Sequence, residues 1–271
     1  MLATFKSDDR VAKTEGIEPF WHLFLVFFLA LHAAEKVLAI EQASAGASAE
    51  IRLEMAFAQA RKDFQTAPTN YDAAWKLSRA AFNRADNMKE GDRDRTSVAR
   101  AGVEAARTAV FLNPSRPEGH YYLGLNLGEI ALAKSLGALK IVKEMEQEFR
   151  KSIEIDPRFD YSGAYRSLGM LYTDVPGWPL GIGNKAKGRE ALQKSVELHP
   201  EFPDNQITLA EAYLKGGFRK DLSEKLNAME KQIASARKQL TGEEWIASWR
   251  DWDNRWQRVK QRLQSGDRKA D

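Results

Sequence analysis

The stretch that decides the fold is "FRKSIEIDPRFDYSGAYRSLGMLY", residues 149–172. One helical pattern ends in it at Pro157, and a second pattern follows that contains Leu-Gly. Proline ends a helix because it lacks the amide hydrogen and clashes with the preceding turn. Similar segments, "AARTAVFLNP" and "LQKSVELHP", reach Pro114 and Pro200, so successive prolines at positions 114, 157 and 200 lie 43 residues apart. The sequence therefore predicts a repeating unit of two helices.

The first helix of each unit shares a pattern of a large residue, then Leu, a small residue and another large residue. The copies are Tyr165, Leu168, Gly169 and Tyr172; His120, Leu123, Gly124 and Leu127; Gln206, Leu209, Ala210 and Tyr213; and a weaker one, Ala74, Leu77, Ser78 and Ala81. The small residue lets two helices approach closely, and the large residue one turn on fills the remaining space. We therefore expect helical hairpins over residues 71–234.

These residues resemble the tetratricopeptide repeat, whose unit is about 34 residues long. The resemblance implies an all-α, right-handed solenoid of about four enlarged tetratricopeptide-like hairpins. A period of 43 leaves about nine extra residues per unit, which we expect in the turns at residues 83–94, 133–143 and 174–184. HEAT and armadillo repeats have this length but lack the Leu-Gly and terminal Pro pattern.

The segments "YYLGLNLGEIALAKSLGALKIVKEM" and "LGMLYTDVPGWPLGIGNKAKGREALQKSVEL" together resemble the T-component family of tripartite (TRAP) transporters. They are more distantly similar to the regulator-of-microtubule-dynamics group. The resemblance spans residues 71–214 and implies a periplasmic helical-repeat protein that binds partner subunits. T-component proteins are often lipoproteins, and the present chain departs from them in having no cysteine to lipidate.

The glycine-rich segment "VPGWPLGIGNKAKG", residues 175–188, allows several interpretations. A phosphate-binding loop would need Gly-Lys-Ser/Thr after a strand, whereas Gly183 precedes Asn184 and the flanking segments are helical. We expect a packed connector in which Trp178 is a stiff apolar plug on the helices below. The alternative is a lid or a partner-contact loop with Trp178 and Leu180 at its surface.

The segment 241–264 is predicted to be a C-terminal helix with an apolar stripe. Its stripe contains Trp245, Trp249, Trp252 and Trp256, which recur at steps of four, three and four residues. We expect this helix to cap the exposed apolar face of the last hairpin. The alternatives are a seam between copies of the chain and a membrane-surface role.

The resemblance to tetratricopeptide repeats also implies a concave groove lined by first-helix residues between the packing positions. The predicted groove residues are Trp75, Arg79, Tyr121, Leu125, Arg166, Met170, Ile207 and Glu211. Their mixture of apolar side chains and two arginines suits an extended peptide or an amphipathic surface.

Residues 1–48 contain the apolar run "FWHLFLVFFLALHAA" at positions 20–34. This run is shorter than the roughly 20 residues of a bilayer span but suits a secretory signal. We therefore divide the chain into a signal peptide or N-terminal anchor, 1–48, and a helical-repeat domain, 49–271. The division predicts an exported, periplasmic or envelope-associated protein that meets a membrane only through its N-terminal segment. The alternatives are a buried core helix and a cytoplasmic protein.

Composition excludes several classes of function. Lys and Arg total 41 against 38 for Asp and Glu, a net charge of +3 that gives no case for nucleic acid. The absence of cysteine excludes disulfides and thiolate metal sites, and the four histidines form no metalloprotease motif. We predict a non-enzymatic scaffold, without cofactor or metal, for a protein or peptide partner such as a transporter subunit. The alternatives are a homo-oligomer assembled through the tryptophan stripe and a carrier of a small apolar ligand.

Overall fold

The structure is a computed structural model that describes residues 49–89, 91–133 and 138–267. The segment 1–48, for which a signal peptide or anchor is predicted, lies outside the described residues. Contacts within the chain separate Glu50–Asp271, as one unit, from the residues before it.

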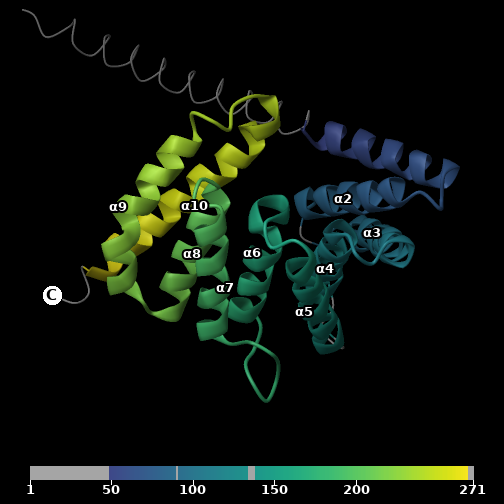
Figure 1. Cartoon of the computed structure of the whole chain (residues 1–271). Helices are drawn as coiled ribbons and strands as arrows, with labels where there is room; N and C mark the ends of the chain where they lie inside the picture. The colour runs from purple at the N-terminus through teal and green to yellow at the C-terminus, as the bar shows by residue number, and fades with distance from the viewer. Residues whose placement is uncertain (1–48, 90, 134–137, 268–271) are drawn as a thin grey trace, which may run out of the picture. The chain divides into compact units, whose positions relative to one another are not determined.

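The described residues fold into helices that pair as hairpins (Figure 1). The pairs are α2 (Tyr71–Asn87) with α3 (Arg93–Leu112), α4 (Pro117–Leu132) with α5 (Ala138–Ile155), α6 (Phe159–Asp174) with α7 (Lys185–Leu198), and α8 (Pro203–Gly216) with α9 (Arg219–Ala236). The last helix, α10 (Glu243–Asp267), follows the fourth hairpin, and residues 49–66 are helical as well. The predicted all-α solenoid of helical hairpins is confirmed.

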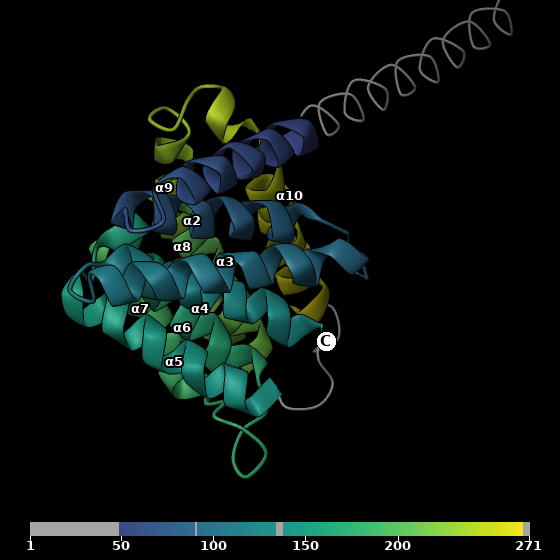
Figure 2. The ribbon, with the colours of Figure 1, turned by 90° about the vertical axis from the view of Figure 1, so that its right-hand side faces the viewer.

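Successive hairpins stack through their first helices. Each of α2, α4 and α6 contacts the next first helix, and each second helix contacts the first helix that follows it. Figure 2 shows residues 49–66, α2 and α3 lying one above the next at the start of this stack. Phe57 from residues 49–66 is buried against the first hairpin, so this segment covers the first apolar face of the stack.

Helix ends follow from local sequence. Asn70 accepts a hydrogen bond from the amide of Ala73 at the start of α2, the usual role of an N-cap asparagine. The helices α3, α5 and α7 end two residues before Pro114, Pro157 and Pro200. The predicted stop of each second helix at its proline is therefore confirmed.

Small residues sit where paired helices touch. A Cβ on Gly169 in α6 would lie 2.5 Å from Cγ of Leu192 and 2.9 Å from the carbonyl oxygen of Gly188, both in α7. A Cβ on Gly124 in α4 would lie 2.5 Å from the Phe149 ring in α5. The glycine of the Leu-Gly pair thus permits the close approach within the second and third hairpins, as the sequence predicts.

The extra residues of the repeat do not all lie in loops. The helix α2 continues to Asn87 and α3 begins at Arg93, so most of the predicted turn 83–94 is helical. The helix α5 begins at Ala138, inside the predicted turn 133–143. The loop prediction is wrong for residues 83–87 and 138–143, which belong to α2 and α5 and include the good helix formers Ala85, Ala138 and Leu139. The third hairpin has a long connection, between Asp174 and Lys185.

Candidate binding surface

An aromatic platform lies on the first-helix face at α2 and α4. The rings of Trp75 and Tyr122 are stacked, with centroids 6.1 Å apart and an angle of 12° between their planes. The Arg79 guanidinium lies 5.2 Å from the centre of the Trp75 ring, because the two residues are one turn apart. Trp75 is half-buried and Arg79 is exposed, so both are accessible from solvent.

Tyr121 lies below this platform and not on the surface. It is buried, and its ring packs edge-to-face on Phe159 with centroids 5.6 Å apart. A Cβ on Gly163 would come within 2.3 Å of the Tyr121 hydroxyl. Burial raises the pKa of Tyr121 well above 10, so the hydroxyl stays protonated at neutral pH. The prediction that Tyr121 is exposed in the groove is wrong because α6 covers its ring.

Arg166 is a second predicted groove residue whose side chain contacts other residues of the same chain. Its Nε lies 3.0 Å from Oδ2 of Asp204, and its guanidinium donates to Oδ1 of Asn205 at 2.7 Å. The same guanidinium stacks on the Phe202 ring at 5.2 Å. Arg166 is buried and joins α6 to α8, so its predicted exposure is also wrong.

The helix α10 covers the last part of the predicted groove. Arg255 of α10 donates to Oδ1 of Asp204 at 2.6 Å and to Oε2 of Glu211 at 2.8 Å. Ile207 is fully buried in the core that α8 shares with α10. Ile207 is therefore not a groove side chain, and Glu211 is engaged by the chain's own helix. Burial opposes the charge on Asp204, but Arg166 and Arg255 outweigh it and lower the pKa of this carboxyl.

The accessible part of the first-helix face is therefore the part on α2, α4 and α6. It contains Trp75, Arg79, the half-buried Leu125 and the exposed Met170. A hollow beside Met170 has a volume of about 30 Å³, well below the roughly 300–1,000 Å³ of a small-molecule site. This hollow does not support the alternative of a small-ligand carrier, whereas an open helical face suits a polypeptide.

Neighbouring carboxylates affect the pKa of Asp86, which lies on α2. The Asp86 side chain reaches solvent, yet its pKa is raised, first by the surrounding protein and then by the charge of Glu129. The carboxylates of Asp251 and Asp204 raise it further, and Arg95 lowers it. Carboxylates of α4, α8 and α10 thus oppose the ionisation of Asp86 on α2.

The loop between α6 and α7 extends away from the helices (Figures 1 and 2). The amide of Gly183 donates to the carbonyl of Pro176 at 2.9 Å, and that of Leu180 donates to Gly177 at 3.0 Å. Trp178 is 90% exposed and Leu180 is 76% exposed. The expectation that Trp178 plugs the helices below is wrong because the loop bonds to itself at its neck. Its role as a lid or contact loop stays a prediction.

The tryptophan stripe of α10 faces the core. Trp249, Trp252 and Trp256 are buried and Trp245 is half-buried. The Trp252 ring lies edge-to-face on Phe202 at the start of α8, with centroids 5.4 Å apart. The predicted capping helix is confirmed, and the burial of these rings argues against a seam between copies that is made by the stripe.

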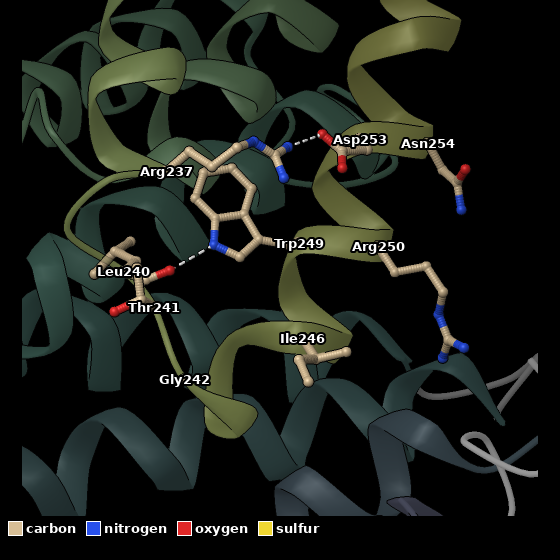
Figure 3. Close-up of a pocket in the computed structure, with 9 residues that line it drawn as sticks. All are labelled: Arg237, Leu240, Thr241, Gly242, Ile246, Trp249, Arg250, Asp253 and Asn254. Carbon is tan, nitrogen blue, oxygen red and sulfur yellow. Dashed lines mark hydrogen bonds and ion pairs between the residues drawn. The ribbon is translucent and has the colours of Figure 1, made fainter.

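A pocket that sequence reasoning missed lies where α9 gives way to α10 (Figure 3). Its volume is about 610 Å³, and we call it the α9–α10 pocket. Its lining consists of Arg237, Leu240, Thr241, Gly242, Ile246, Trp249, Arg250, Asp253 and Asn254. The indole of Trp249 donates to the carbonyl of Leu240 at 2.7 Å, and Arg237 stacks on its ring at 4.1 Å while pairing with Asp253. The sequence feature that could have indicated this pocket is Ile246, an apolar residue of the C-terminal helix that does not belong to the tryptophan stripe.

The described residues also lack two features that other classes of protein have. No group of three or more His, Cys, Asp or Glu side chains in that part of the chain is arranged to hold a metal ion. None of its helices combines the length and the apolar character that crossing a membrane requires.

Comparisons with known proteins give a family and a fold. A family model described as "Regulator of microtubule dynamics protein 1-3" matches residues 39–175. Among solved structures, a thermophilic TPR protein of Thermus thermophilus, TTC0263, has 16% identity and a TM-score of 0.56, with 78% of this chain and 92% of that chain covered. MamA has 17% identity and a TM-score of 0.49, with coverage of 69% and 91%. No curated protein matches. The predicted resemblance to tetratricopeptide repeats is confirmed.

Proposed function

The chain belongs to the regulator of microtubule dynamics protein 1-3 family, and we propose that it is a non-enzymatic scaffold that binds a polypeptide on its open first-helix face. The observation that carries the proposal is the pair of accessible side chains Trp75 and Arg79, with the Trp75 ring stacked on the buried ring of Tyr122. Aromatic and arginine side chains dominate the binding energy of protein interfaces. A stacked pair is also held in place before binding, so little side-chain entropy is lost when a partner arrives.

Asp86 is an exposed carboxylate on this side that a basic residue of the partner could meet. Its pKa is raised first by desolvation from neighbouring protein atoms and then by the charge of Glu129. A lysine or arginine of the partner near Asp86 would relieve this repulsion. An apolar or aromatic residue of the same segment would rest on Trp75.

A transporter subunit as the partner, and a place in the cell envelope, stay predictions. The matches reported above name no transporter subunit, and the predicted signal or anchor lies outside the described residues. The name of the matching family makes microtubules a second partner to test.

The test is affinity capture from crosslinked cells, read by mass spectrometry, with wild type and an Arg79→Glu variant as baits. The matched control is Arg100→Glu, because Arg100 is an equally exposed arginine on α3, a second helix. Substituting Tyr121 or Arg166 would test folding instead, since both are buried.

We expect a specific protein to be recovered with wild type and with Arg100→Glu, and at least tenfold less with Arg79→Glu. The captured protein, once purified, should bind wild type in calorimetry and lose at least tenfold in affinity with Arg79→Glu. Purified tubulin is the second titrant. Equal recovery with all three baits would remove the first-helix face as the binding site.

A further inference from the structure

We propose that the α6–α7 loop of one copy inserts Trp178 and Leu180 into the α9–α10 pocket of a second copy, so that the chain associates head to tail. The proposal is separate from the scaffold function, because neither the loop nor the pocket includes a residue of the Trp75 platform.

The loop has the properties of an apolar peg. Its tip, residues 177–181, carries Trp178 and Leu180, which are 90% and 76% exposed. No charged residue occurs from Val175 to Asn184. Backbone hydrogen bonds close the neck, including one from the amide of Asn184 to the carbonyl of Tyr172 at 2.8 Å. Such a loop is ordered before it binds, which favours tight docking.

The α9–α10 pocket has the properties of a matching socket. The pocket is open to solvent, and its volume of about 610 Å³ leaves room for the side chains of a loop tip. Leu240 and Trp249 supply apolar surface, and Ile246 is 62% exposed at the same pocket. An uncharged tip adds no further charge to the pocket, where Arg237 and Asp253 already pair with each other.

A cation at the pocket also suits an incoming indole. Within the part of the chain that the structure describes, Arg250 makes no hydrogen bond or ion pair. Arginine stacks favourably on tryptophan, and the neighbouring Arg237 already does so on Trp249 at 4.1 Å. Arg250 can therefore do the same with the ring of Trp178.

The tip of one chain cannot occupy the pocket of the same chain. In both views the α6–α7 loop lies at one end of the helices and the connection between α9 and α10 at the other (Figures 1 and 2). Packed helices hold both segments, so the tip cannot reach its own pocket. Peg and socket are different surfaces, so the contact closes in a two-fold dimer only if each copy fills the pocket of the other, and otherwise continues as a ring or an open chain.

The absence of cysteine in the chain allows a direct test with the full-length protein. Single variants Leu180→Cys and Ile246→Cys are mixed in equal amounts and oxidised. The matched control pairs Leu180→Cys with Phe111→Cys, because Phe111 is an apolar side chain on α3 that is 85% exposed. We expect the first mixture to give at least tenfold more disulfide-linked dimer than the control. Adding Trp178→Ala to the Leu180→Cys chain should abolish that excess.

Three results would overturn the proposal. They are equal yields in the two mixtures, an excess that survives Trp178→Ala, and stronger linking of Leu180→Cys to itself, which would mean tip-to-tip contact. Circular dichroism of each variant confirms that it is folded. An Arg79→Glu substitution in both chains should leave the yield unchanged, so failure of the scaffold function and failure of self-association can be told apart.

Discussion

The α6–α7 loop and α10 both contain tryptophan, but they place it in opposite environments. Trp178 of the loop is 90% exposed, whereas Trp252 of α10 is 5% exposed. The tryptophans of α10 recur at helical steps, so they lie on one face of the helix, and that face packs on the core. Trp178 lies among glycines and prolines, where the backbone turns on itself and leaves no shared face. The same side chain thus closes a core in one segment and forms an exposed tip in the other.

The largest expected effect tests the buried half of this comparison. Trp252→Ala should lower the free energy of unfolding by about 3–5 kcal/mol, because it opens a cavity in the core shared by α8 and α10. Urea unfolding followed by circular dichroism measures the change. A loss below about 1 kcal/mol, which is typical of a surface site, would mean that α10 does not cap the last hairpin.

The ion-pair cluster that holds α10 on α8 should give the next effect. Asp204→Asn weakens the pairing with Arg166 and Arg255, and we expect a loss on the order of 2 kcal/mol at pH 7. The folded-state pKa of Asp204 is lowered, so its contribution is present above its ordinary value of 3.8 and is lost as the pH falls through the folded value.

Unfolding curves of wild type and Asp204→Asn at pH 7 and at acid pH check this expectation. The two proteins should differ at pH 7 and converge as the pH falls below about 4. A difference that does not depend on pH would show that the charge of Asp204 is not what stabilises the junction of α8 and α10.

A smaller effect concerns the neck of the exposed loop. Asn184 accepts hydrogen bonds from the amides of Ala186 and Lys187 at the start of α7. Asn184→Ala should cost about 1 kcal/mol through loss of this N-cap. Hydrogen exchange at residues 176–183 should rise as well. Unchanged exchange would show that the backbone bonds at the neck hold the loop without the cap.

The smallest effect tests the exposed half of the comparison. Trp178→Ala should change the free energy of unfolding by less than about 0.5 kcal/mol, because the side chain contacts solvent and not a core. Parallel urea curves of this variant and of Trp252→Ala make the comparison direct. A loss of about 2 kcal/mol or more, typical of a buried site, would place Trp178 against the helices after all.

The sequence predicts the elements that follow from local and periodic rules. Prolines at a constant spacing end the second helices, Gly124 and Gly169 occupy the close contacts within hairpins, and the spacing of the tryptophans in α10 implies a buried stripe. Each of these features depends on backbone chemistry or on the helical period. Both can be recognised from residues that are close together in the sequence.

The predicted exposure of the groove residues agrees less well with the structure. Trp75, Arg79 and Met170 are accessible, as expected, but Tyr121 and Ile207 are buried. A repeat pattern assigns equivalent positions to equivalent environments, yet the last unit of a solenoid differs from the others because it must be covered.

Which surfaces the chain covers with its own helices depends on how the hairpins pack. The return of α10 onto α8 brings Arg255 to Asp204, two residues 51 positions apart, and the turn from α9 into α10 forms the α9–α10 pocket. No local pattern encodes such a contact, since its free energy depends on groups that meet only after the hairpins have stacked. The number of hairpins, their helix ends and the cap were therefore readable from residue order, whereas the open face, the exposed tip and the pocket depended on packing.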